Sequence, residues 1–306
     1  MDSKKFLTKK SNVIILAIFC SILWGSAFPT LKVSYIELSM NSADMIGKIV
    51  LAGMRFFIAA IMIFLFLIFV LKKSIKISKS DIIKLLILGL IQTTFQYFFF
   101  YTGVSNTTGS KSSILTSVGS FIVVIIAHFY YKDDRINKEK SIGLILGFIG
   151  IVIINLGNGF NVDFNFYGEG FIIISTTLGS VGTIMAKELS KTINPFVITA
   201  WQMLLGATIL LIFGLPQLSP EAITFTLKGW ILLIYAAILS ATAFSLWYSL
   251  LKYNKAGEIS IYKFVIPVSG SILSIMFLEG EVFTINTFIA LILVSLGIMA
   301  INYKKS

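Results

Sequence analysis

The sequence contains very few of the residues that build metal centres and disulfide frameworks. Its 306 residues include one cysteine, Cys20, and one histidine, His128. A single cysteine excludes an internal disulfide framework and a cysteine-based metal site, and a single histidine excludes a histidine cluster within one chain. We therefore expect no metal ion.

Charged residues are also scarce, at 13% of the chain, whereas 57% of the residues are hydrophobic and the mean hydropathy is +0.92. A soluble chain of this length needs far more polar surface to cover its core. The apolar residues occur in long runs of roughly 20 residues, the length that a helix needs to cross the hydrocarbon of a bilayer. These runs predict an all-α integral membrane protein.

The apolar runs predict ten transmembrane helices, of which the fifth is the shortest. Their expected ranges are Asn12–Leu31, Met45–Leu71, Asp81–Val104, Ser110–Tyr131, Lys140–Leu156, Gly168–Lys187, Pro195–Leu215, Lys228–Leu251, Gly257–Leu278 and Thr284–Tyr303.

The basic residues predict the orientation of these helices. If the N-terminus is cytoplasmic, nineteen of the 25 Lys and Arg residues fall on the cytoplasmic side, four fall outside, and Arg55 and Lys263 lie within spans. This bias predicts a multi-pass protein with both termini in the cytoplasm. Residue usage rich in Ile, Lys, Asn and Phe points weakly to a bacterial inner membrane. The net charge of +11 comes from short clusters between apolar runs, which suit lipid headgroups of the bilayer and predict no nucleic-acid partner.

An internal repeat relates helices three to five to helices eight to ten. At an offset of about 148 residues the matches are Thr94/Thr242, Asn106/Asn254, Gly109/Gly257, Ser112/Ser260, Gly150/Gly297 and Asn155/Asn302. Because each half contains five helices, the second half enters the membrane from the opposite side. The sequence therefore predicts two inverted five-helix repeats, residues 1–156 and 157–306, an arrangement typical of transporters that work by alternating access.

Several short motifs resemble the EamA type of the drug/metabolite transporter superfamily. They are Leu23-Trp24-Gly25-Ser26-Ala27-Phe28-Pro29, Arg55, Tyr101-Thr102 through Ser113-Ile114-Leu115, Ile266-Pro267-Val268, Leu278-Glu279-Gly280-Glu281 and Gly297-Ile298. The resemblance covers nearly the whole chain and implies ten helices in two homologous halves that carry small metabolites. The chain departs from the family pattern at Gly119, where the first half usually has a mid-helix proline, and the acidic residue after helix four corresponds to Asp133.

Lys263 is the strongest candidate for a substrate-binding residue. A charge inside a span is costly and usually faces a wet cavity or a partner, so this cation is suited to a carboxylate or phosphate. The alternative is that its long side chain reaches the cytoplasmic interface. Pro267, four residues later, is a candidate hinge or a fixed kink, whereas Pro29 is expected to close helix one. For Arg55 we favour a structural role, with the side chain tied to headgroups or backbone carbonyls.

The other candidates are amides and aromatic rings. Gln92 and Gln96 share one face of helix three and line a cavity or join helices to one another. Aromatic candidates for substrate contact are Trp24, Phe28, Tyr97, Trp247 and Tyr262, although packing is the more frequent role of any single aromatic ring.

No Asp or Glu lies in the middle of a predicted span, which favours neutral, zwitterionic or anionic solutes over cationic drugs. We expect an exporter of amino acids or similar compounds, and the alternative is a carrier of phosphorylated or nucleotide-linked metabolites. The sequence lacks the acid–base constellation that an intramembrane enzyme needs, and it lacks the filter motif of a channel. The Gly103–Ser112 segment has the wrong spacing for a phosphate-binding loop, so we expect no cofactor. A homodimer is left open.

Overall fold

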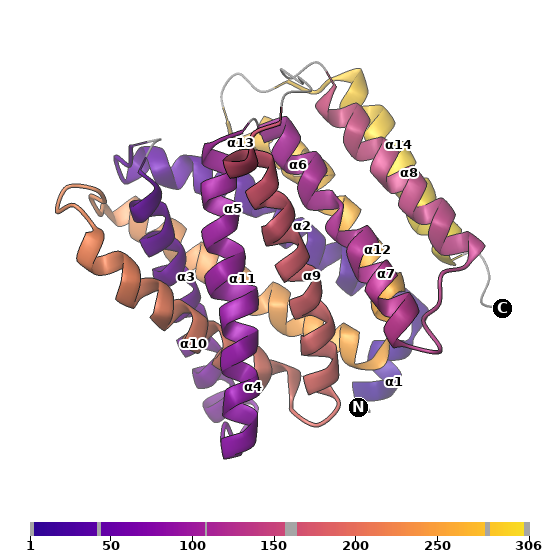
Figure 1. Ribbon diagram of the computed structural model, residues 1–306, viewed down its shortest axis with the longest axis horizontal. Coiled ribbons are helices and arrows are strands. Elements are labelled where there is room, and N and C mark those ends of the chain that lie inside the picture. Colours follow the sequence, from indigo (N-terminus) through magenta and orange to yellow (C-terminus); the bar gives the residue numbers. More distant parts are fainter. Residues whose placement is uncertain (1–2, 42–43, 108, 157–163, 279–281, 303–306) are drawn as a thin grey trace.

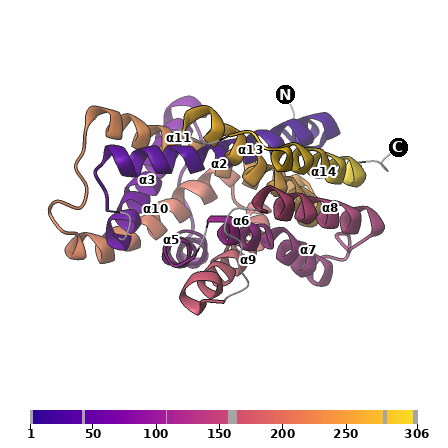
Figure 2. The ribbon, with the colours of Figure 1, turned by 90° about the horizontal axis from the view of Figure 1, so that it is seen from above.

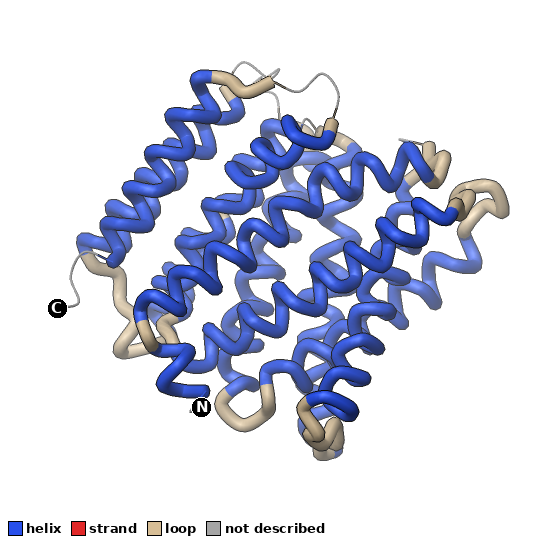
Figure 3. Tube along the Cα trace, turned by 180° about the vertical axis from the view of Figure 1, so that it is seen from behind, coloured by secondary structure: helices blue, strands red, loops and turns tan. Residues whose placement is uncertain are grey.

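The computed structural model describes residues 3–41, 44–107, 109–156, 164–278 and 282–302. Within these ranges every regular element is a helix, which confirms the predicted all-α class (Figures 1 and 3). The motif residues Glu279, Gly280 and Glu281 lie outside the described residues.

The first half of the chain contains the first five predicted helices. They are α2 (Lys10–Glu37), α3 (Met45–Leu65) with a π-helical extension η1 (Phe66–Val70), α4 (Lys79–Gly89) continued through the π-helical turn η2 (Leu90–Phe95) into α5 (Gln96–Ser105), α6 (Gly109–Ser117) with α7 (Gly119–Tyr130), and α8 (Lys138–Asn155). A short helix that was not predicted, α1 (Ser3–Thr8), precedes them.

The second half contains the other five. They are η3 (Phe166–Gly170) with α9 (Phe171–Ser190), α10 (Pro195–Gly214) with η4 (Leu215–Gln217), α11 (Leu227–Tyr253), α12 (Ala256–Ile261) with the 3₁₀ turn η5 (Tyr262–Phe264) and α13 (Val265–Phe277), and α14 (Ile285–Asn302). In the described part of the chain nine of the ten helical segments are long and apolar enough to span a membrane. The tenth is α8, whose first three residues are charged, and it packs along the apolar α14 (Figures 1 and 2).

The helix contacts follow the predicted repeat. Helix two packs on helix seven as the α3–α10 pair, and helix five packs on helix ten as the α8–α14 pair; these pairs lie at opposite ends of the molecule (Figure 2). The packing of α2 on α11 and α13 has its counterpart in the packing of α9 on α5 and α7. Exchanging the two halves therefore reproduces the main contacts, as a pseudo-two-fold axis requires.

Matched asparagines of the repeat also make matched hydrogen bonds. The side chains of Asn106 and Asn254 donate to carbonyls four residues earlier at 2.8 and 2.9 Å, and those of Asn155 and Asn302 do so at 2.7 Å. Each asparagine thus closes the end of its helix by satisfying a terminal carbonyl. The boundary predicted at residue 156 adjoins residues that the structure does not describe and stays a prediction.

Both ends of the described chain lie on one face of the molecule. The ammonium of Lys10 donates to the carbonyl of Asn302, which joins the start of α2 to the end of α14. On the same face the side chain of Asn254 donates to the carbonyl of Leu7 at 2.9 Å. An even number of crossings places the two ends together in this way.

Pro29 does not close the first helix, which corrects the prediction from the sequence. It is buried within α2, and the helix continues to Glu37. Proline removes one backbone donor and disturbs the helical hydrogen bonds around it. The hydroxyls of Thr30 and Ser34 donate to the carbonyls of Ser26 and Thr30 at 2.8 and 2.7 Å, and such side-chain bonds help membrane helices to tolerate proline.

Helices four and nine are both interrupted at matching positions of the repeat. Helix four breaks at Val118, directly before Gly119, and helix nine tightens into the 3₁₀ turn η5 directly before α13, which contains Pro267. Helix four is therefore interrupted at this point although position 119 is a glycine and not a proline. In helix nine the hydroxyl of Ser21, on α2, donates to the carbonyl of Tyr262 at 3.0 Å, and this bond satisfies backbone within the interrupted region.

Candidate functional site

Lys263 lies within the interrupted part of helix nine and points into the bundle. Its ammonium is 5.4 Å from the centroid of the Trp247 ring on α11. In the described parts of the chain it makes no hydrogen bond and no ion pair. The ammonium thus lies against an aromatic ring of α11, and the side chain is partly exposed. Its charge is stabilised by a cation–π contact and stays available to an anionic ligand.

Aromatic rings from four helices extend from this cation toward Arg55. We call them the aromatic cluster: Trp24 on α2, Phe56 on α3, Tyr97 on α5, and Phe244, Trp247 and Tyr248 on α11. The Trp24 ring lies 5.1 Å from Trp247 and 5.2 Å from Phe244, in edge-to-face geometry. Phe56 connects Phe244, at 6.5 Å, with Tyr97, at 4.5 Å. The structure thus brings together four sequence candidates, namely Trp24, Tyr97, Trp247 and Lys263.

Two polar atoms of the aromatic cluster have no hydrogen-bond partner in the described structure. They are the indole N–H of Trp247 and the hydroxyl of Tyr248, both fully buried. A buried polar group without a partner is costly, and in a transporter such a group is suited to a substrate. Each is a donor that an oxygen atom of a substrate can satisfy.

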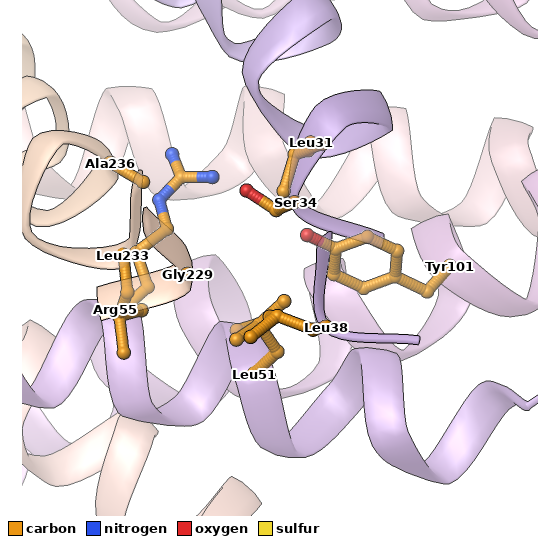
Figure 4. Close-up of a pocket in the computed structure, with 10 residues that line it drawn as sticks. Leu31, Ser34, Leu38, Leu51, Arg55, Tyr101, Gly229, Leu233 and Ala236 are labelled. Atoms are coloured by element: carbon orange, nitrogen blue, oxygen red, sulfur yellow. The ribbon is translucent and has the colours of Figure 1, made fainter. Parts of the chain in front are cut away.

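Arg55 is tied to a side-chain hydroxyl, whereas the sequence favoured a tie to headgroups or backbone carbonyls. Its side chain is 4% exposed, and its Nε donates to the hydroxyl of Ser240 on α11 at 2.7 Å. Its guanidinium lines a narrow cavity between α2, α3, α5 and α11, together with Ser34 and Tyr101 (Figure 4). The side chain turns inward because α11 supplies the hydroxyl that positions it.

Gln92 and Gln96 lie between helix three and α9. A Cβ atom at Gly182 would lie 1.7 Å from the Gln92 Oε1, and one at Gly179 would lie 2.9 Å from the Gln96 Nε2. The two glycines therefore make room for the amides, whose Oε1 atoms are buried without a partner in the described structure. The π-helical turn η2 ends directly before Gln96, and such turns occur often at functional sites. This packing favours a role in joining helices.

The other candidates lie further from the aromatic cluster. Phe28 is 43% exposed and covers Gly270 at the crossing of α2 and α13. Tyr262 is buried, and its hydroxyl accepts a hydrogen bond of 2.8 Å from the side chain of Asn302. Pro267 lies in the first turn of α13, where a proline is well tolerated after the break at η5.

A buried ion pair connects the two halves on the face that carries the chain ends. The ammonium of Lys140 lies 2.5 Å from the carboxylate of Asp134, and both side chains are at most 2% exposed. The other oxygen of Asp134 accepts a hydrogen bond of 2.9 Å from the backbone N–H of Gly257, at the start of α12. Asp133, which the family resemblance singled out, is exposed. The buried acidic residue after helix four is therefore Asp134.

Ser34 of the cavity and Phe56 and Phe244 of the aromatic cluster were not predicted from the sequence, and Arg55 was expected to have a structural role. The cost of a charge inside a span, which identified Lys263, applied equally to Arg55. No comparable signal marked the two phenylalanines among the 27 of the chain.

Comparison with known proteins agrees with the fold. The model of the EamA-like transporter family matches residues 11–156 and again residues 166–303. The chain is 30% identical over 283 residues to the uncharacterized transporter YetK of Bacillus subtilis, covering 87% of this chain and 84% of that protein. It is 29% identical over 293 residues to an uncharacterized transporter of Archaeoglobus fulgidus, covering 95% and 99%. A crystal structure of a protein with 14% sequence identity superposes with a TM-score of 0.77 over 96% of this chain and 99% of the other, which supports the fold.

Proposed function

The chain belongs to the EamA-like transporter family, and on that premise we propose that it is a secondary transporter that exports amino acids or similar carboxylate-bearing metabolites across the cell membrane. The solute crosses by alternating access between the two inverted halves, and both chain ends face the cytoplasm.

One observation carries this proposal: Lys263 is a cation inside the bundle that no acidic side chain of the described chain pairs with. A charge away from water needs a partner, and a substrate carboxylate supplies one during each transport cycle. The unpartnered N–H of Trp247, whose ring contacts Lys263, and the unpartnered hydroxyl of Tyr248 are two further donors within the aromatic cluster. Amino acids fit because they combine a carboxylate with side chains that stack on or pack against aromatic rings.

Counterflow in proteoliposomes tests the proposal. Vesicles containing the purified protein are loaded with an unlabelled mixture of the twenty amino acids, and the uptake of each labelled amino acid from outside is followed. We expect transient accumulation of at least one labelled amino acid above that in protein-free vesicles. If every labelled amino acid enters only at the protein-free rate, the amino-acid assignment fails.

A second candidate is a carrier of phosphorylated or nucleotide-linked metabolites. It is favoured by the presence of two cations beside the aromatic cluster, Arg55 and the partly buried Lys263, because phosphate carries more negative charge than a carboxylate. Competition distinguishes the candidates: a sugar phosphate that suppresses amino-acid counterflow, or that shows counterflow of its own while amino acids show none, supports the second.

A further inference from the structure

The cavity beside Arg55 has the features of a second binding site. It is lined by apolar side chains and three polar groups: the Arg55 guanidinium, the Ser34 hydroxyl and the Tyr101 hydroxyl. Figure 4 shows these groups pointing toward one another across the gap. The cavity is narrow, with a volume of about 10 Å³, so that it has room for one water molecule in this conformation.

The guanidinium is held in a fixed orientation with its terminal nitrogens free. Its Nε donates to Ser240, whose own hydroxyl donates to the carbonyl of Ala236 at 2.7 Å. The central carbon of the guanidinium lies 4.9 Å from the centroid of the Phe56 ring, so one face of the group rests on an aromatic surface. The terminal nitrogens make no hydrogen bond and no ion pair with any residue that the structure describes. These are the two donors that bind a carboxylate in bidentate geometry.

Arg55 and Lys263 lie near opposite ends of the aromatic cluster. Arg55 is ten residues into α3, about 15 Å from its first residue, and Lys263 is seven residues after the start of α12, about 10 Å away. Since α3 starts at the face opposite the chain ends and α12 starts on the same face as them, the two cations are approached from opposite sides. Lys48, two turns before Arg55 on α3, lies over the Tyr35 ring at 5.6 Å and adds positive charge at the entrance.

We propose that the Arg55 guanidinium, through its terminal nitrogens, forms a carboxylate-binding site on the outer side of the aromatic cluster. The site holds the solute carboxylate before or after its contact with Lys263. Its place in the transport cycle rests on the proposed function, whereas binding of a carboxylate there does not.

The chain allows a direct chemical test because it contains two arginines, Arg55 and the exposed Arg135. In the Arg135→Lys protein, phenylglyoxal can modify only one arginine, and mass spectrometry follows the adduct on the peptide that contains residue 55. Sodium benzoate serves as the carboxylate probe, and benzamide serves as the neutral probe of the same shape.

We expect residue 55 to react slowly in the native protein, and benzoate to slow the reaction about tenfold at saturation while benzamide leaves it unchanged. Equal protection by both compounds, or no protection by either, overturns the proposal. Failure of the native protein to react at all, when the unfolded protein reacts fully, also overturns it, because a binding site must be reachable from water.

Transport measurements separate this inference from the proposed function. If counterflow is found, Arg55→Gln should raise the outside KM about tenfold or more, and Arg55→Lys should recover part of the loss. Counterflow that is unchanged in Arg55→Gln leaves the proposed function intact and overturns the outer site. Protection by benzoate without any counterflow supports the site and contradicts the proposed function.

Discussion

The ammonium of Lys263 lies 5.4 Å from the centroid of the Trp247 ring, and no carboxylate of the described chain approaches it. Lys263 lies in η5, within the interrupted helix nine, and Trp247 lies in the continuous helix α11. Both residues belong to the second half of the chain. A cation held by an aromatic ring alone is weakly compensated, since an exposed cation–π contact contributes about 0.5–1 kcal/mol and a desolvated one about 2 kcal/mol.

We predict that Lys263→Gln leaves the stability of the purified protein unchanged or raises it. Removing a partly buried charge that has no ionic partner in the described structure removes a desolvation penalty and breaks no ion pair. Thermal unfolding in detergent measures the effect, with Lys252→Gln at the end of α11 as the control. A fall in Tm by several degrees for Lys263→Gln alone would mean that Lys263 holds the structure together.

We predict that Asp134→Asn strongly destabilises the protein. It leaves Lys140 buried without its counter-charge, and loss of one partner of a buried pair typically costs about 3–5 kcal/mol. It also weakens the hydrogen bond to the N–H of Gly257. Thermal unfolding and the yield of folded protein are the measurements, and Asp133→Asn is a matched control because that neighbouring carboxylate is exposed.

The double variant Asp134→Leu with Lys140→Met separates charge from packing. Replacing both members of a buried pair by apolar residues is often tolerated. We expect it to be more stable than Asp134→Asn alone. An equal or larger loss would show that the bond to Gly257, and not the ion pair, dominates.

We predict that Gly25→Ala disrupts the crossing of α2 and α13. A Cβ atom there would lie 2.1 Å from the Ser269 hydroxyl and 2.9 Å from backbone atoms of Ile266 and Gly270. The backbone of α13 must shift, at a typical cost of about 1–3 kcal/mol for overpacking. Thermal unfolding should show a lower Tm, and Ser269→Ala should rescue little, because the two backbone contacts remain. Wild-type stability of Gly25→Ala would mean that the helices are less closely packed than described.

We predict that cysteine labelling places Thr8 and Ser80 on the cytoplasmic side and Ser219 outside. All three are exposed, and the only native cysteine, Cys20, is buried and can be replaced by serine. A membrane-impermeant maleimide applied to intact cells should label Ser219→Cys directly, and Thr8→Cys and Ser80→Cys only after the membrane is opened. Labelling of Thr8→Cys in intact cells would reverse the orientation.

The sequence predicted the helices well because crossing a bilayer imposes a local requirement, a long apolar run, on each segment. The repeat was visible because asparagines such as Asn106 and Asn254 perform the same local task at the same helix end. Pro29 was misjudged because its tolerance depends on the hydroxyls of Thr30 and Ser34, whose hydrogen bonds are not apparent from residue type.

The candidate site was predicted in part, because a lone charge in a span is a strong signal whereas its partners are a tertiary property. Lys263 was identified, but its contact with Trp247 depends on the packing of helix eight against helix nine. Arg55 was expected to be tied to headgroups or backbone carbonyls because the hydroxyl that positions it, that of Ser240, lies 185 residues away in the chain. Asp134 and Asp133 are adjacent in a loop, and only the fold decides which one is buried.

The central claim is that Lys263 binds the carboxylate of the solute. The most direct test compares counterflow of the amino acid that the wild type exchanges fastest, using equal amounts of folded wild-type, Lys263→Arg and Lys263→Gln proteins. The account predicts that Lys263→Gln exchanges about tenfold or more slowly than the wild type, while Lys263→Arg retains part of the activity, because a charged hydrogen bond to the solute is lost in one and altered in the other. Exchange by Lys263→Gln at the wild-type rate would contradict it.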